Sequence, residues 1–252
     1  PTGIADSRSI AIRGITGQNL FGTSGATGFY IDDTPMPSSI DPRIVDIDNI
    51  EVLKGPQGTL YGESSLGGNV KLVTKQPNMA TRELDTTVQG GITSGGGSPD
   101  GGASAILNLP IRDDLAVRIV AFGNHDAGYL TRTYPDSTSP AVTDPFLTVP
   151  RTSVGDQGAI STFGGSATAL WNVTDRFSVE LRLMHQQQTD HGFPATFAPL
   201  PAFTPVYTLN RAFNVQPTAS DRWTMPSLVF KFQGESFDIV SSTSYFHRRT
   251  ED

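Results

Sequence analysis

The chain has 252 residues, of which 17% are charged, with a formal net charge of -7 and no cysteine. The lack of cysteine excludes disulfides and thiolate metal sites, and the acidic balance argues against a nucleic-acid binder, which needs a basic face. His185 and His191 form the closest histidine pair and lack the spacing of a metalloprotease zinc pair. No metal site or cofactor is therefore predicted, and no apolar run approaches the roughly 20 residues of a membrane helix.

Short strands and turns are predicted at the start of the chain. An alternating run within residues 9–17 predicts one strand, and residues 29–31 predict a second strand that ends at Asp32-Asp33. A turn explains these two aspartates better than a catalytic or calcium-binding pair does. Asp41 before Pro42 has the order of a helix cap and a first helical residue, so residues 42–49 are predicted to form a brief helix.

Residues 46–77, DIDNIEVLKGPQGTLYGESSLGGNVKLVTKQP, join two strand patterns through a glycine-rich stretch. Three catalytic interpretations fail on this stretch. A P-loop needs Lys-Ser or Lys-Thr where Glu63-Ser64 stands, a nucleophile elbow needs glycine in place of Leu66, and the glycine spacing does not fit a dinucleotide-binding loop. The glycines are therefore interpreted as turn and close-approach residues, Gly55-Pro56 among them, and no enzyme activity is predicted.

The string IEVLKGPQGTLYG, followed by LGGNVKLVTKQP, closely resembles the end of the plug domain of TonB-dependent outer-membrane receptors. Two upstream segments agree in order. Residues 12–15, IRGI, resemble that family's IRG segment, and residues 29–35, FYIDDTP, resemble its Y-[IVL]-D-[DG]-x-P segment. The sequence departs from the pattern at Lys54, where arginine is more usual, and at residues 63–66, which replace a more neutral, alanine-containing linker. Lysine keeps the charge of arginine but not its bidentate fork.

The resemblance assigns structural roles in the plug motif to twelve residues. They are Arg13, Gly14, Asp32, Glu51, Lys54, Gly55, Pro56, Gly58, Tyr61, Gly62, Gly67 and Gly68. Within this set Gly67-Gly68 is expected to make a tight backbone approach before a strand at residues 69–74, whose residues alternate strictly.

Long strands are predicted beyond Pro77, at residues 83–93, 102–111, 115–130, 158–172, 177–188, 223–234 and 237–248. Their connections alternate between short ones, at 112–114, 173–176 and 234–236, and longer ones, at 94–101, 131–157 and 189–222. This alternation is typical of transmembrane barrels, which have short periplasmic turns and longer extracellular loops. The change in character places a domain boundary near residue 78.

The faces of these strands also alternate. The pattern predicts that Leu181 and Phe230 face lipid while Arg182 and Lys231 face the lumen of a barrel. A soluble sandwich has the same alternation, with core and water in place of lipid and lumen. Residues beside the short turns would form an apolar and aromatic girdle at the inner membrane interface: Leu115, Trp171, Phe177 and Phe237. A core position is the alternative for Trp171.

Together, the pattern and the resemblance predict a mixed α/β plug piece over residues 1–78. Over residues 79–252 they predict about seven antiparallel strands of a transmembrane barrel that is expected to have about 22, so that the sheet stays open. The resemblance further leads us to expect that the chain begins partway through the plug, without a signal peptide or the short energy-coupling box.

The resemblance implies a receptor, not an enzyme, in the outer membrane of a Gram-negative bacterium. It would bind and import a scarce nutrient, a ferric siderophore or similar metal chelate, with outer-membrane lipid and a TonB-type energy-transducing protein as its other partners. A soluble or surface β-rich carbohydrate-binding module, such as a lectin-like sandwich, explains the alternation but not the ordered motifs. A surface hydrolase would need a catalytic motif that the sequence does not contain intact.

Overall fold

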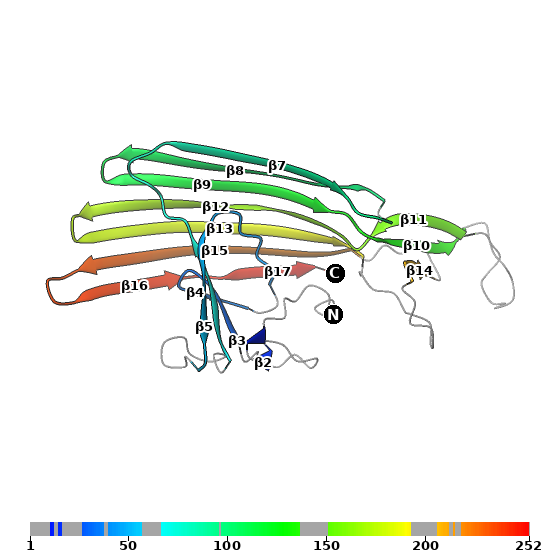
Figure 1. Cartoon of the computed structure of the whole chain (residues 1–252), viewed down its shortest axis with the longest axis horizontal. Coiled ribbons are helices and arrows are strands. Elements are labelled where there is room, and N and C mark those ends of the chain that lie inside the picture. The colour runs from blue at the N-terminus through cyan, green and yellow to red at the C-terminus, as the bar shows by residue number, and fades with distance from the viewer. Residues whose placement is uncertain are drawn as a thin grey trace.

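The computed structural model of the chain is built of β-sheets (Figure 1). The structure describes residues 11–12, 15–16, 27–37, 40–56, 67–95, 97–136, 151–192, 206–211, 214 and 218–251. Within these ranges every regular element is a strand, and accordingly none contains a helix long and apolar enough to cross a membrane.

The large sheet contains eight antiparallel strands and is open, with an edge at each side (Figure 1). Its strands follow one another in the sequence in nearly the order in which they lie side by side, so consecutive strands are antiparallel neighbours, except that the last two both pair with the strand before them. They are β7 (Glu83–Ile92), β8 (Pro99–Arg112), β9 (Leu115–Asp126), β12 (Ala159–Thr174), β13 (Phe177–His191), β15 (Thr218–Gln233), β16 (Asp238–Ser244) and β17 (His247–Glu251). All seven predicted strands are present, and the open sheet is confirmed.

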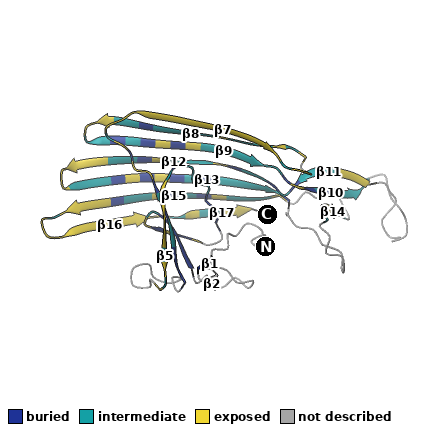
Figure 2. Ribbon diagram, viewed as in Figure 1, coloured by how far each residue is buried: buried dark blue, intermediate teal, exposed yellow. Residues whose placement is uncertain are grey.

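Alternation of side chains gives the large sheet two different faces. Leu181 points outward and is 56% exposed, whereas its neighbour Arg182 points to the inner face, where the small sheet lies, and is 2% exposed. Figure 2 shows the same banding of buried and exposed residues along the strands. Trp171 is on the outer face and 43% exposed, so the alternative of a core tryptophan is wrong.

The last predicted strand, residues 237–248, is divided into β16 and β17. Both parts pair with β15, and the interruption lies opposite Pro226. The Tyr245 amide donates to the Pro226 carbonyl oxygen at 3.0 Å. Proline has no N–H to return this bond, so the ladder is interrupted for lack of a donor.

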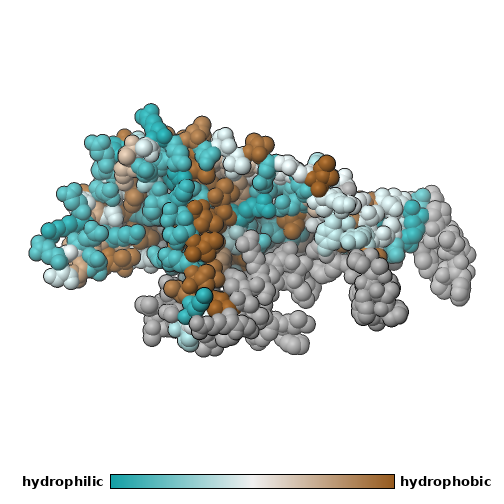
Figure 3. Space-filling model, viewed as in Figure 1, coloured by the Kyte–Doolittle hydropathy of each residue, from teal (hydrophilic) through white to brown (hydrophobic). Residues whose placement is uncertain are grey.

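The small sheet has the order β4-β3-β6-β5 and lies across the inner face of the large sheet (Figure 1). Its strands are β3 (Thr27–Ile31), β4 (Thr34–Met36), β5 (Ile47–Lys54) and β6 (Gly68–Thr74), and β3 pairs with β6 in parallel. The two aspartates after β3 form the predicted turn. Apolar side chains of β5, Ile50 and Val52 among them, are exposed in the space-filling view (Figure 3). A separate pair, β1 (Ala11–Ile12) and β2 (Ile15–Thr16), precedes the small sheet.

The helix predicted at residues 42–49 is wrong. Residues 40–46 are irregular, and β5 begins at Ile47 and pairs with β6. The local capping signal of Asp41 and Pro42 is outweighed by the tertiary contacts of this segment, because the ladder with β6 and an ion pair of Asp46 with the large sheet both need extended chain. The α/β description of this part of the chain is corrected accordingly: all its described elements are strands.

The long connections of the large sheet also contain strands. β10 (Leu130–Pro135) pairs with β11 (Arg151–Gln157) and with β14 (Thr208–Asn210) in a sheet of order β11-β10-β14 (Figure 1). This sheet lies at the end of the large sheet opposite the two-residue turns 113–114 and 175–176. The two ends of the large sheet therefore differ as predicted, one with short turns and one with long connections.

Candidate functional site

The small sheet contacts the large sheet through a mixed apolar cluster. Five of its buried members come from residues 29–72, and three come from inward positions of β13 and β15. They are Phe29, Ile31, Met36, Ile40 and Leu72 against Met184, Trp223 and Met225. Burial of this apolar surface favours the contact at roughly 25 cal/mol per Å². The cluster is small, so polar contacts around it decide how firmly the two sheets are joined.

Arg182 of β13 forms the first polar contact. Its guanidinium donates to the Asp32 carboxylate and the Thr74 hydroxyl of the small sheet, and to Glu180 Oε1 of its own strand at 2.7 Å. Asp32 has a φ of 51°, and it also accepts the Thr74 amide at 2.9 Å. The turn after β3 thus directs a carboxylate at a buried arginine of the large sheet.

Arg118 of β9 forms the second. It is 3% exposed and binds the Asp46 carboxylate with two nitrogens, Nε and Nη2, the latter at 2.9 Å from Oδ1. Its Nη1 donates to Glu83 Oε2 of β7 at 3.0 Å. Asp46 is 7% exposed, so this is a buried, bidentate ion pair between the two sheets.

The two arginines lie in one row of the large sheet. Thr168 of β12 is the register partner of Arg118 on one side and of Arg182 on the other. Two strand spacings therefore separate them, roughly 10 Å. Arg118 binds Asp46, which precedes β5, and Arg182 binds Asp32, which follows β3. Because these two ion pairs hold different segments, they resist both sliding and rotation of the small sheet.

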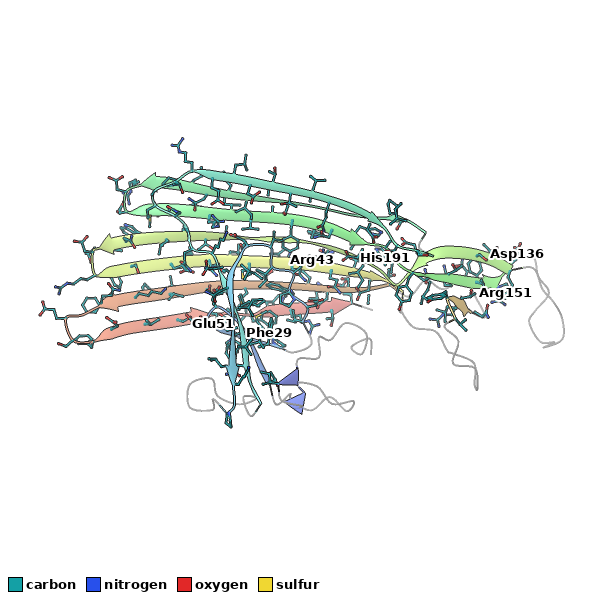
Figure 4. The ribbon with its side chains drawn as sticks, in the orientation of Figure 1. Phe29, Arg43, Glu51, Asp136, Arg151 and His191 are labelled. Carbon is teal, nitrogen blue, oxygen red and sulfur yellow. The ribbon has the colours of Figure 1, made fainter. Side chains whose placement is uncertain are left out.

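Three further hydrogen bonds involve the chain between β4 and β5. Gln186 of β13 accepts the Arg43 amide at 2.8 Å and donates to the Asp41 carbonyl oxygen at 2.9 Å. The Arg43 side chain, labelled in Figure 4, reaches Asp126 of β9 at 2.6 Å. A cavity of about 20 Å³ lies between these groups and Arg118, enough for about one water molecule. A larger cavity of about 260 Å³ is lined by Arg43 and Val45 of this segment and by residues of β7, β8 and β9, so the seam is polar around its apolar centre and only partly filled.

Asn108 of β8 fixes the chain that joins the two sheets. It is fully buried, accepts the Asn78 amide at 2.9 Å and donates to the carbonyl oxygens of Asn78 and Thr81 at 2.8 and 2.6 Å. Asn78 in turn accepts the Ala80 amide at 2.7 Å, a local turn. The connection is held against the wall of the large sheet before β7 begins.

The predicted motif residues are placed only in part by the structure. Asp32 is in the Arg182 contact, while Glu51, Lys54 and Pro56 are exposed on or just after β5. Gly55 has a φ of 97° and Gly68 a φ of 133°, and a Cβ at Gly68 would overlap the Leu53 carbonyl oxygen. The Gly55 amide donates to the Gly67 carbonyl oxygen at 3.2 Å. The remaining predicted residues lie outside the described part of the chain: Arg13, Gly14, Gly58, Tyr61 and Gly62.

Sequence reasoning missed Asp46, Arg118, Asn108 and Gln186 as contact residues. A usable signal was present for the three residues of the large sheet. Each is a polar or charged side chain at an inward position of a strand, where it needs a partner once water is excluded. The partners could not be named, since Asp32 and Arg182 are 150 residues apart in the sequence.

An open antiparallel sheet with short turns at one end, carrying a second sheet pinned to its inner face, has the geometry of a barrel wall with a plug. The model of the TonB-dependent Receptor Plug Domain family matches residues 2–69. The pesticin receptor of Yersinia enterocolitica is 36% identical over 109 residues, which are 42% of this chain and 15% of that protein. The catecholate siderophore receptor Fiu of Escherichia coli K12 is 30% identical over 117 residues, 45% of this chain and 15% of that protein.

Solved structures have the same fold. The ferric yersiniabactin uptake receptor FyuA from Yersinia pestis superposes with a TM-score of 0.79 at 19% identity, over 99% of this chain and 36% of that chain. The siderophore receptor PiuA from Acinetobacter baumannii gives a TM-score of 0.68 at 14% identity, over 99% and 32%. Residues 2–69 thus match the plug domain of TonB-dependent receptors, and the relatives and solved structures that the chain resembles are receptors by name and not enzymes. The chain spans about a third of the solved receptors that it matches.

Proposed function

We propose that the protein binds a scarce nutrient at the cell surface and imports it across the outer membrane, with a ferric siderophore or similar metal chelate as the cargo. The relatives support the nutrient class, because three of those named above are by their names a catecholate siderophore receptor, a ferric yersiniabactin uptake receptor and a siderophore receptor. A carbohydrate-binding sandwich would leave the plug-domain match unexplained.

The composition of the contact between the small sheet and the large sheet supports the transport mechanism. The small sheet, as the plug, is joined to the wall by a limited apolar cluster and by ion pairs, of which those of Arg118 and Arg182 are buried. Ion pairs and hydrogen bonds can be exchanged for water contacts when the plug moves, whereas a continuous apolar core would have to be exposed as a whole. This seam supports a plug that stays closed at rest and yields when an inner-membrane partner of the TonB type pulls on it.

We also propose that residues 1–78 form the plug and residues 79–252 the wall. The small sheet ends at Thr74, the large sheet begins at Glu83, and Asn108 holds the connection between them. In this division Asp32 and Asp46 are the plug's contacts with the wall. Gly55, Gly67 and Gly68 shape the plug's own turns.

Deletion of the complete gene tests the nutrient class. The mutant is expected to grow poorly under iron starvation when a single ferric siderophore is the iron source, and to recover with the gene on a plasmid. Uptake of radioactive iron bound to each of several siderophores identifies the cargo. Normal uptake of every chelate in the deletion strain would contradict a metal-chelate cargo and redirect the search to other scarce nutrients.

A further inference from the structure

The outer face of the large sheet changes from apolar to polar partway along β13 and β15. On β13 the outward residues Leu181 and Leu183 are followed by His185. On β15 Phe230 and Leu228 precede Arg222 in the same direction, toward the long connections. Long connections are extracellular in outer-membrane barrels. The change from apolar to polar therefore marks the level of the outer-leaflet headgroups.

Four side chains that are cationic or can become so gather at this level. Arg222 of β15 is the direct register partner of Arg249 of β17, and the next outward pair is Thr224 with His247. Thr224 also pairs with His185 of β13, whose Nδ1 lies 2.8 Å from the Thr224 hydroxyl. We name these residues the outer basic cluster: Arg222, Arg249, His185 and His247.

The pairing of Arg222 with Arg249 is unfavourable by itself, because like charges directly opposite on one face of a sheet repel. Arg249 is bound to Glu251 at 2.6 Å, but both side chains are more than half exposed, so the pair is weak. Arg222 donates to the neutral Gln187 at 3.0 Å and has no carboxylate partner within the described ranges. An anion between the two guanidinium groups would remove the repulsion.

The position of the cluster identifies the anion. Guanidinium groups match phosphate in geometry and charge. Immediately on the membrane side of the cluster lie the outward Pro226 and Leu228 of β15 and Leu183 of β13. A molecule with a phosphate headgroup and acyl chains would contact both regions at once, whereas a free phosphate ion would contact the arginines alone.

We propose that the outer basic cluster is a binding site for the phosphorylated headgroup of an anionic lipid of the outer leaflet. Its phosphate lies between Arg222 and Arg249, and its acyl chains follow Leu183 and Leu228 along the apolar part of the wall. The site lies on the outer face, away from the plug, and is independent of the cargo.

Binding of diphosphorylated lipid A to the full receptor in detergent, measured by native mass spectrometry, tests the proposal. The double variant Arg222→Gln/Arg249→Gln is expected to bind roughly 30-fold more weakly, since each arginine near an anionic lipid surface contributes a factor of about five. Arg222→Lys/Arg249→Lys keeps the charge and is expected to lose only a few-fold. The matched control is Arg176→Gln, an exposed arginine in the turn at the opposite end of the wall.

Three results would overturn the proposal. The first is that the double glutamine variant binds lipid A as tightly as the unchanged receptor does. The second is that the Arg176 variant loses as much affinity for lipid A as the double variant does. In the third, inorganic phosphate displaces lipid A at equal molar concentration, which would identify a site for a free anion. Unchanged heat-modifiable migration of each variant in gels establishes that the barrel has folded, so weaker binding then reports on the cluster itself.

Discussion

Replacement of Arg118 by methionine is expected to loosen the plug without unfolding the wall. Methionine fills much of the same volume, but it leaves the carboxylate of Asp46 buried without its bidentate partner. Removal of one member of a buried ion pair costs about 3–5 kcal/mol. The free energy that separates the docked from the undocked plug should fall by this amount, which raises the undocked population roughly 150- to 4000-fold.

Native-state hydrogen exchange of the Arg43 amide in the full receptor measures this free energy, because that amide donates to Gln186 of the large sheet and exchanges when the plug undocks. Arg176→Met is the matched control. Arg176 is 58% exposed and pairs with Glu235 at 3.3 Å, so its loss should change the opening free energy by less than about 0.5 kcal/mol. The double variant Arg118→Met/Asp46→Leu should recover most of the loss, because an apolar pair can replace a buried ion pair. Unchanged exchange in Arg118→Met, or additive losses in the double variant, would refute the reasoning.

Three further predictions concern single side chains. Gly68→Val should destabilise the plug by about 2–6 kcal/mol, because the position has a left-handed dihedral and an added Cβ overlaps the Leu53 carbonyl oxygen. Gly101→Ala, whose added Cβ meets open space, is the control, and equal denaturation curves for the two variants would contradict the prediction. Leu181→Arg should cost roughly 2–4 kcal/mol of barrel stability at the lipid face and lower the heat-modifiable fraction more than Arg182→Leu does. Arg182→Leu should instead speed hydrogen exchange in the plug. If Arg182→Leu impaired barrel assembly more, the register would be displaced by one residue. Asn108→Leu should remove the donor to the carbonyl oxygens of Asn78 and Thr81, at about 0.5–1.5 kcal/mol for each hydrogen bond, and make the connection sensitive to protease. Cleavage at the unchanged rate would count against this role.

The strands of the large sheet could be predicted from the sequence because their side chains alternate between two faces with different surroundings. An exposed outer face and an inner face covered by the small sheet require alternation such as that of Leu181 and Arg182, and this signal needs no knowledge of the partner strand. Strand ends that depend on a neighbouring strand or on pairing within a long connection could not be predicted in this way. The interruption between β16 and β17 arises from a proline in the neighbouring strand, and β10 and β11 pair with each other inside a segment that has the composition of a loop.

The plug's contacts could not be predicted in the same way. Residues 42–49 carry a local helix-start signal, but Asp46 is bound by an arginine 72 residues later in the chain. A single sequence gives the positions of inward charges and not their partners. Burial of such a charge nevertheless requires a partner. The inward position of Arg118 and Arg182 thus indicates that each arginine has a partner inside, but not which carboxylate that partner is.

Each of the two wall arginines has a second carboxylate close to it, one that belongs to the wall itself. Arg118 is bound by Glu83 as well as by Asp46, and Arg182 by Glu180 as well as by Asp32. In the proposed movement of the plug, neither arginine would be left as an isolated charge, because Glu83 and Glu180 stay beside them. By this proposal the charges of the large sheet would stay balanced while the plug is displaced, so that the plug would meet the same contact surface when it returns.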